Sequence, residues 1–305
     1  MNRHWGNRLA MIGLAALTAM SLGAEDQDKD DSHPDGKGGG TMQHQPAPDP
    51  FAKGNAKPSG NGINYHGGPV MLGTTNMHFI YYGNWGANGT LTTAQSILAD
   101  FAQHFGGSPY YNINTTYFDG SNNHVANSVT FAGAVSVGSP FGNNISDANL
   151  VSIVASTNPT DTNGVYFVLT SPEVNETSGF CTVYCGFHTH ATINGHDIKY
   201  SFVGDGARCP SACSAQTVTP NGNLDADEMA NVISHEFEES TSDPDLNAWF
   251  DRRGQENADK CNFNFGATQT TSTGAHYNQT LGTRKYLIQQ NWLNANGGLC
   301  VQHYP

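Results

Sequence analysis

The spacing of hydrophobic residues predicts strands and helices that alternate along the chain after residue 62. Runs rich in aromatic and β-branched residues indicate strands, and apolar residues at helical spacing indicate helices. At 92–105 the apolar side chains fall on one helical face, and Gly106 and Gly107 follow as a stop signal. Strands are expected at 75–82, 128–137, 165–169 and 196–203. Helices are expected at 92–105, at 147–156 and from Asp225 to just before Pro244.

The last of these helices combines an apolar stripe with a polar flank. Asp225 is expected to be its N-cap, because a short side-chain oxygen there accepts from backbone N–H groups of the first turn. His235 and Glu239 lie about 40° apart on the flank beside the stripe. We expect the stripe to pack on a core and the flank to face a cleft. The stripe consists of Met229, Val232, Ile233 and Phe237.

The sequence HEFEE at 235–239 contains the pattern H-E-x-x-E. In the related pattern H-E-x-x-H, the first and last residues bind zinc and the intervening Glu acts as a general base. Here His235 and Glu239 are the predicted ligands, and Glu236 is the predicted base that takes a proton from water. A catalytic zinc site requires a third protein ligand. Glu256 and Asp259 are both candidates for it, and the sequence does not choose between them.

Acidic residues crowd the C-terminal end of this helix. Glu238, Glu239 and Asp243 lie where the helix dipole disfavours each anion by about 0.3–1 kcal/mol. A bound cation would reverse the sign of that interaction. The alternative is a solvated acidic helix end with one incidental histidine.

Other residues with metal-binding or catalytic chemistry give weaker signals. His276 can stabilise an oxyanion or can be an ordinary loop histidine. His188 and His190 in FHTH have a strand-like spacing that suits a metal, but beside Cys185 they are expected in a disulfide loop. Asp243 and Asp245 provide oxygen ligands that suit calcium as well as zinc.

The first residues have the pattern of an exported protein. Residues 1–24 contain Arg3 and Arg8, an apolar run at 9–22 and small residues at the end, as in a signal peptide. That run is shorter than the roughly 20 residues that span a bilayer, and no later segment reaches this length. Residues 25–61 form a polar, Pro- and Gly-rich tract that we expect to be a disordered leader. Residues 62–305 are then a single domain.

Six cysteines in an exported chain indicate a disulfide framework. The short C-x3-C spacings predict the pairs Cys181–Cys185 and Cys209–Cys213, and Cys261 would then pair with Cys300. A four-cysteine zinc site is the competing interpretation. Disulfides are favoured because thiolates seldom persist as ligands in an oxidising compartment.

The net charge of −13 makes nucleic acid and anionic membranes poor partners, because the sequence contains no Lys/Arg cluster. Only 13% of the residues are charged, and Gly, Asn, Thr and Ser are frequent, which is typical of extracellular bacterial proteins. These features fit a soluble extracellular protein but do not name a substrate; the predicted partner is a peptide or a cell-wall or other extracellular polymer. They do not set the oligomeric state.

Several segments together resemble the phosphate-induced protein 1 family, known in plants as EXORDIUM and EXORDIUM-like proteins. They cover nearly everything after residue 62 and occur in the family's order. The segments are YHGGPVMLGTTNMHFIYYGNW (65–85), FCTVYCGFH (180–188), the Cys209/Cys213 segment, TPNGNLDADEM (219–229), TSDPDLNAWF (241–250) and YNQTLGTRKYLIQQNW (277–292), followed by Cys300.

The resemblance implies an extracellular or cell-wall location and, for plant members, a role in growth signalling without an established enzymatic activity. The plant pattern typically lacks the His and Glu that here read HEFEE. Either this chain belongs to a metal-binding branch, or the domain is noncatalytic and HEFEE is incidental.

The order of elements predicts an α+β, zincin-like domain with a mixed β-sheet, a backing helix and an active-site helix, stapled by disulfides. The predicted function is that of a secreted zinc-dependent hydrolase, a metallopeptidase that uses the H-E-x-x-E helix. The alternative is a noncatalytic extracellular or cell-wall binding or signalling module of the EXORDIUM type.

Overall fold

A mixed five-stranded sheet forms the centre of the domain in the computed structural model, which describes Met1, Lys37 and residues 62–86 and 89–305. The strand order is β3-β2-β5-β8-β7. Neighbouring strands from β3 to β8 are parallel, and β7 is an antiparallel edge strand paired with β8. The five strands are β2 (Thr75–Tyr82), β3 (Val129–Gly138), β5 (Gly164–Thr170), β7 (Gly186–Ile193) and β8 (His196–Val203).

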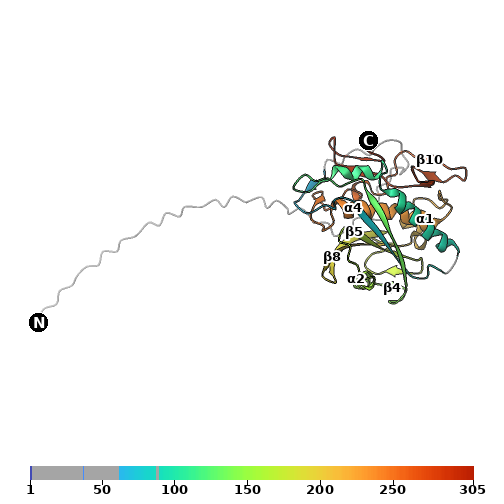
Figure 1. The fold of residues 1–305 in the computed structure, drawn as a ribbon, viewed down its shortest axis with the longest axis horizontal. Coiled ribbons are helices and arrows are strands. Elements are labelled where there is room, and N and C mark those ends of the chain that lie inside the picture. Colours follow the sequence, from blue (N-terminus) through green and yellow to red (C-terminus); the bar gives the residue numbers. More distant parts are fainter. Residues whose placement is uncertain (2–36, 38–61, 87–88) are drawn as a thin grey trace. The chain divides into compact units, whose positions relative to one another are not determined.

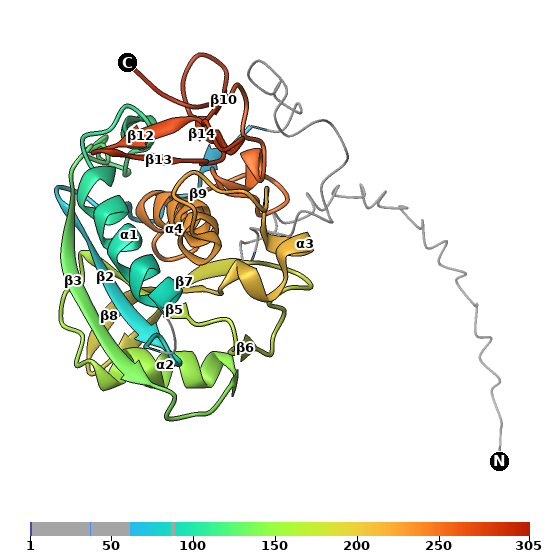
Figure 2. The ribbon, with the colours of Figure 1, turned by 90° about the vertical axis from the view of Figure 1, so that its right-hand side faces the viewer.

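Helices cover both faces of this sheet. Helices α1 and α4 lie side by side on one face, and α2 lies on the other (Figures 1 and 2). The 3-10 helix η2 packs beside α4 and contributes a buried asparagine to it. The helices are α1 (Gly89–Phe105), η2 (Tyr111–Thr116), α2 (Asp147–Ser156), η3 (Gly206–Arg208), α3 (Pro210–Cys213), α4 (Leu224–Ser242) and η4 (Asp259–Cys261).

Short hairpins from the C-terminal third cover the side of α4 that faces away from the sheet (Figure 2). Each of these hairpins is a two-stranded antiparallel pair. Elsewhere in the domain, β4 and β6 form a two-stranded parallel pair. The remaining strands are β1 (Asn64–Tyr65), β4 (Asn144–Ile145), β6 (Asn175–Glu176), β9 (Trp249–Phe250), β10 (Gln269–Thr270), β11 (His276–Tyr277), β12 (Gln279–Leu281), β13 (Arg284–Tyr286), β14 (Asn291–Leu293) and β15 (Leu299–Val301).

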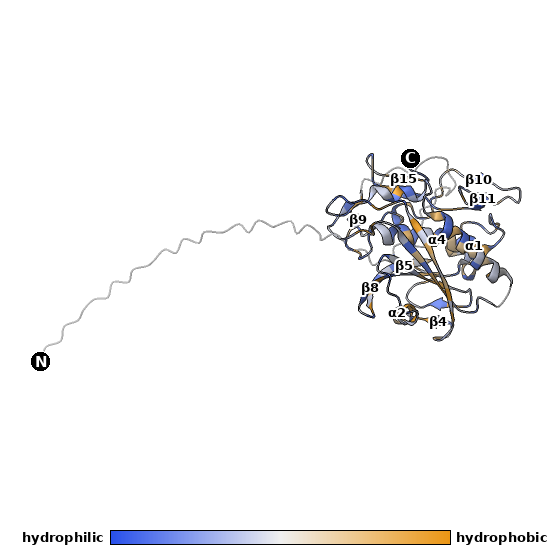
Figure 3. Ribbon diagram, in the orientation of Figure 1, coloured by the Kyte–Doolittle hydropathy of each residue, from blue (hydrophilic) through white to orange (hydrophobic). Residues whose placement is uncertain are grey.

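These hairpins change the environment expected for α4. Every residue from Asp225 to Ser242 is buried, so the expected cleft-facing flank lies inside the domain. Hydrophilic and hydrophobic residues are mixed along the helix (Figure 3). The expectation of an open flank was wrong because the covering hairpins consist of strands of two or three residues, which are too short to show a hydrophobic period. A polar helix is therefore enclosed on all sides.

The expected α+β class and the disulfide framework are confirmed, but two disulfide pairings were wrong. The bonds join Cys181 to Cys209, Cys185 to Cys213 and Cys261 to Cys300. Cys209 precedes the single turn of α3 and Cys213 is its last residue, and both are bonded to the 181–185 loop, with Cα–Cα distances of 5.8 and 5.6 Å across the two bonds. The two bonds tie the segment before β7 to the segment before α4. All six cysteines are paired, which leaves no thiolate for a four-cysteine zinc site.

The disulfides fit a protein that folds outside the cytoplasm. Across the described residues, no helix combines the length and the apolar character needed to cross a membrane. The expected signal peptide and leader lie outside the described residues, apart from Met1 and Lys37.

Two carboxyl groups meet at the beginning of α4. Asp205 is fully buried and caps η3 by accepting from the Ala207 N–H at 2.9 Å. Burial, followed by the nearby charge of Asp225, raises the pKa of Asp205 to about 8. The pKa of Asp225 is also raised, chiefly by burial. Because the folded state holds this proton more tightly than the unfolded chain, whose Asp pKa is about 3.9, the pair stabilises the fold only while it is protonated.

We expect the free energy of unfolding to fall as pH rises from about 4 through about 8, and Asp205→Asn to weaken this fall. Asparagine keeps the acceptor for Ala207 and does not ionise. Urea denaturation at about pH 5 and about pH 8.5 should show a loss at least about 1 kcal/mol smaller in the variant than in the wild type. Asp119→Asn is the control, because the pKa of this exposed carboxyl is already below its ordinary value. Equal losses in wild type and Asp205→Asn would contradict the expectation.

Candidate metal centre

Helix α4 holds the H-E-x-x-E residues in the interior of the domain. Its N-cap is Asn223, whose side chain accepts from the Ala226 N–H at 2.9 Å, rather than the expected Asp225. Asp225 lies instead in the first turn and pairs with Asp205. The helix ends at Ser242, two residues before Pro244, as the proline predicts.

One cluster of potential ligands contains His235, Glu239 and Asp259. His235 Nε2 lies 3.1 Å from Glu239 Oε1 and 3.4 Å from Asp259 Oδ1. The three potential ligand atoms all lie within 4.8 Å of one another. The predicted ligands His235 and Glu239 therefore lie beside Asp259, one of the two candidates for the third ligand.

A second cluster shares Glu239 and contains His188 and Glu256. His188 Nε2 lies 3.0 Å from Glu256 Oε2 and 3.6 Å from Glu239 Oε2. Their ligand atoms also lie within 4.8 Å of one another. Glu256, the other proposed third ligand, is thus beside His188. The carboxylate of Glu239 points one oxygen at each histidine.

The turn that contains Glu256 and Asp259 is fixed from several sides. The Asp259 N–H donates to Glu239 Oε1 at 3.0 Å, and the Glu256 N–H donates to Asp259 Oδ2 at 3.2 Å. The Asn257 amide donates to Asn114 Oδ1 at 3.0 Å. Two residues beyond Asp259, Cys261 is bonded to Cys300. These hydrogen bonds and the disulfide hold the turn, and with it the carboxylates of Glu256 and Asp259, in place.

Several polar atoms in and beside the two clusters are buried and have no hydrogen-bond partner among the described residues. Leaving such an atom unsatisfied costs about 1–3 kcal/mol, and more when the group is charged. Imidazole nitrogen and carboxylate oxygen are the donors that zinc accepts, so the set fits a zinc ion. The atoms are His235 Nε2, both carboxylate oxygens of Glu236, Glu239 Oε2, Glu256 Oε1 and Asp259 Oδ1.

Burial dominates the electrostatics of the centre. It raises the pKa of Glu236 well above its ordinary value, opposed by His235 and assisted by Glu239. It also raises the pKa of Glu256, with a further contribution from Glu239. Burial lowers the pKa of His188 to about 4, so its imidazole is neutral at pH 7, as a metal ligand must be. For His235 burial lowers the pKa, but Glu239 and Asp259 together raise it well above its ordinary value.

Glu236 lies at a small hollow between β7 and α4. The hollow has a volume of about 10 Å³, roughly the room for one water molecule. Both Glu236, the predicted base, and His235 line this hollow. Its lining consists of Cys185, Gly186, Asn231, Val232, His235, Glu236, Asn262, Phe263 and Gln289.

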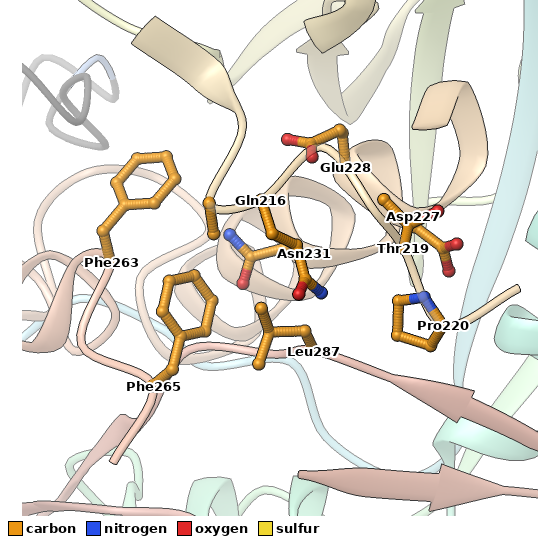
Figure 4. A pocket seen from close by; sticks show the side chains of 10 residues that line it. Gln216, Thr219, Pro220, Asp227, Glu228, Asn231, Phe263, Phe265 and Leu287 are labelled. Atoms are coloured by element: carbon orange, nitrogen blue, oxygen red, sulfur yellow. The ribbon is translucent and has the colours of Figure 1, made fainter. Parts of the chain in front are cut away.

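A second hollow of similar size adjoins the first, because both are lined by Asn231 and Phe263. In Figure 4, Gln216 and Asn231 lie beside each other in its centre, with Phe263 and Phe265 on one side. Glu228 and Asp227, from the first half of α4, lie on the other side. The two hollows follow α4 from its first turns towards Glu236.

His276 lies in the β10–β11 hairpin, next to the second hollow. Its backbone N–H donates to Gln216 Oε1 at 2.7 Å, and its Nδ1 lies 3.0 Å from Thr268 Oγ1. The expected oxyanion role of His276 stays a prediction.

The aspartates considered as calcium ligands have protein partners. Asp243 Oδ1 accepts from the backbone N–H groups of Asn247 and Ala248, each at 2.6 Å. Asp245 Oδ1 lies 2.9 Å from the Lys199 ammonium, which also pairs with Asp197. His190, which lies 2.9 Å from Asp197, belongs to this half-exposed cluster rather than to the buried centre. A lysine already supplies the positive charge there.

His188 gave only a weak signal as a ligand in the sequence. The segment FHTH, which contains His188 and His190, was expected in a disulfide loop, but it lies in the edge strand β7. The i, i+2 spacing of the two histidines was the available signal. Because side chains alternate along a strand, His188 and His190 point to the same face, yet only His188 reaches α4.

Comparisons with known proteins identify the same family that the sequence motifs resemble. The family model described as phosphate-induced protein 1 conserved region matches residues 63–302. Protein EXORDIUM-like 5 of Arabidopsis thaliana is 28% identical over 285 residues, covering 78% of this chain and 77% of that protein. Protein EXORDIUM-like 3 of the same plant is 28% identical over 276 residues, covering 75% and 80%. No solved structure matches the chain.

Close contact between β7 and α4 gives a test of this geometry. A Cβ on Gly186 would lie 2.6 Å from Val232 Cγ1 and 3.0 Å from Glu236 Oε1. We expect Gly186→Ala to lower the free energy of unfolding by about 1–3 kcal/mol, because strand and helix must separate. Gly62→Ala is the control, since its Cβ meets no atom within 4 Å. Chemical denaturation compares the two, and equal stabilities would show that β7 does not pack on Glu236 as described.

Proposed function

The chain belongs to the phosphate-induced protein 1 family, and on this premise we propose that it is a secreted zinc-dependent hydrolase, specifically a peptidase. The observation that supports the proposal most strongly is the convergence of His235, Glu239 and Asp259 in a buried site where His235 Nε2 and Asp259 Oδ1 lack hydrogen-bond partners among the described residues. The three disulfides support the proposed export.

Each residue of the site has a role that its position supports. His235, Glu239 and Asp259 would hold the ion, which when bound supplies a Lewis acid that polarises a carbonyl and lowers the pKa of water. Glu236 follows the first ligand directly and borders a hollow of one-water size, so it can take the proton of an attacking water. This assignment gives the zincin-like arrangement of helix, base and downstream third ligand.

A peptide is the substrate that the sheet favours. Strand β7 is the edge of the sheet next to α4, and in the described part of the chain its ladder partner is β8 alone. The other side of an edge strand offers N–H and C=O groups to an extended peptide. Such a peptide would pair with the more accessible half of β7, residues 189–192, next to the buried centre. A cell-wall or other extracellular polymer would not use this strand in the same way.

One observation favours the alternative, a noncatalytic binding or signalling module. Glu236, Glu239 and Glu256 are each only 1% exposed, so a bound ion would be well shielded from a large substrate. In that case the ion would stabilise the fold and Glu236 would have no chemical role.

Glu236→Gln separates the two functions. We expect it to lower the rate of peptide or casein cleavage by at least about 100-fold, since general acid–base catalysis contributes about 10²–10⁴. Zinc content should stay unchanged, because Glu236 is not a ligand, and a chelator should abolish cleavage by the wild type. Cleavage and metal content are measured on the same preparations by peptide mass spectrometry and elemental mass spectrometry.

Glu238→Gln is the matched control on the same helix. Glu238 is equally buried, its pKa is also raised well above its ordinary value by burial, and its carboxyl accepts from Tyr110 instead of facing His235. The control should retain both zinc and cleavage. Zinc-loaded wild type that cleaves no peptide would favour the noncatalytic module, and cleavage that survives Glu236→Gln would remove the proposed base.

A further inference from the structure

The carboxylate of Glu239 divides its two oxygens between two separate ligand sets. We propose that the domain binds two divalent metal ions rather than one, an inference that rests on the proposed metal centre. The first ion is the one assigned to His235, Glu239 and Asp259. The second is held by His188, Glu256 and the other oxygen of Glu239.

The distances place the two histidines at different ions. His235 Nε2 lies 3.1 Å from Glu239 Oε1, and His188 Nε2 lies 3.6 Å from Glu239 Oε2. Among the described residues, each set of three gathers its ligand atoms within 4.8 Å, and no set contains both histidines. One ion with five ligands would require both histidines in one set. A carboxylate between two ligand sets is the arrangement of a two-metal site.

The second set is buried, and its hydrogen bond between His188 Nε2 and Glu256 Oε2, at 3.0 Å, is the contact that an ion would replace. His188, Glu239 and Glu256 are each 1% exposed, so water does not solvate them freely. Glu239 Oε2 and Glu256 Oε1 have no hydrogen-bond partner in the described part of the chain. These two atoms belong to groups that burial alone would disfavour as anions. An ion between them and His188 would satisfy both.

The number of buried carboxylates also favours a second divalent ion. Glu236, Glu239, Glu256 and Asp259 are all buried within this centre. In the part of the chain that the structure describes, the ion-pair partners of Glu239, Glu256 and Asp259 are histidines, and the nearby Lys260 pairs with Asp251. One divalent ion would leave two of four carboxylate charges uncompensated if the histidines are neutral ligands. Two divalent ions would compensate all four.

Metal stoichiometry tests the inference. Protein purified with zinc should contain about two equivalents by elemental mass spectrometry. His188→Ala and Glu256→Gln should each reduce this to about one equivalent, and Asp259→Asn should remove the other one. His190→Ala is the matched control on the same strand, because His190 pairs with Asp197 outside the centre, and it should retain two equivalents.

A titration of metal-free wild type with cobalt(II) tests the same point without any variant. Two ions predict two saturating steps in the visible spectrum and magnetic coupling between the cobalt ions after the second step. A single step at one equivalent, with zinc lost together in the His188 and Asp259 variants, would overturn the second ion and leave the hydrolase proposal intact. Protein that binds no zinc at all would overturn both.

Discussion

The burial of the carboxylates that α4 brings into the interior is the constraint on which the rest of the structure depends. Helices normally bury an apolar stripe and leave their charges in water. Here a helix with three carboxylates within about one turn, at 236, 238 and 239, is enclosed completely. Burying an unpaired carboxylate is costly enough that proteins protonate it, pair it or place it on a metal. At Glu238 and Asp205 the structure uses protonation and hydrogen bonds. At Glu239 it brings two histidines and two further carboxylates instead.

The rest of the domain can be understood as the means of bringing these groups together. The sheet positions His188 on its edge strand, and the paired disulfides hold the beginning of that strand against the segment that leads into α4. The turn at 256–259 is held on the other side by Asn257 and by the bond from Cys261 to Cys300. Strand β7 and the turn at 256–259, which are distant in sequence, thus converge on Glu239 of α4. Small shifts of β7 or of the turn would separate the ligand sets, which explains the close contact at Gly186.

The sequence predicts the long elements well and the enclosure of α4 poorly. The strands β2 and β8 and the helix α2 have the expected bounds, because each buries a clear hydrophobic face. His235, Glu236 and Glu239 are predictable from local spacing alone. His188 and the choice between Glu256 and Asp259 depend on strand order and turn geometry, which a local pattern does not contain. The disulfide pairs were misassigned for the same reason, since the two C-x3-C segments lie opposite each other only in the fold.

The central claim, that the buried carboxylates of α4 hold metal, is tested most directly by X-ray diffraction from crystals of the purified protein. Data collected on both sides of the zinc absorption edge give an anomalous difference map that locates zinc independently of the coordinates. Metal binding predicts strong peaks beside Glu239, at about 2.0–2.2 Å from His and carboxylate ligand atoms. A map without any peak at Glu239, in crystals grown with zinc, would contradict it.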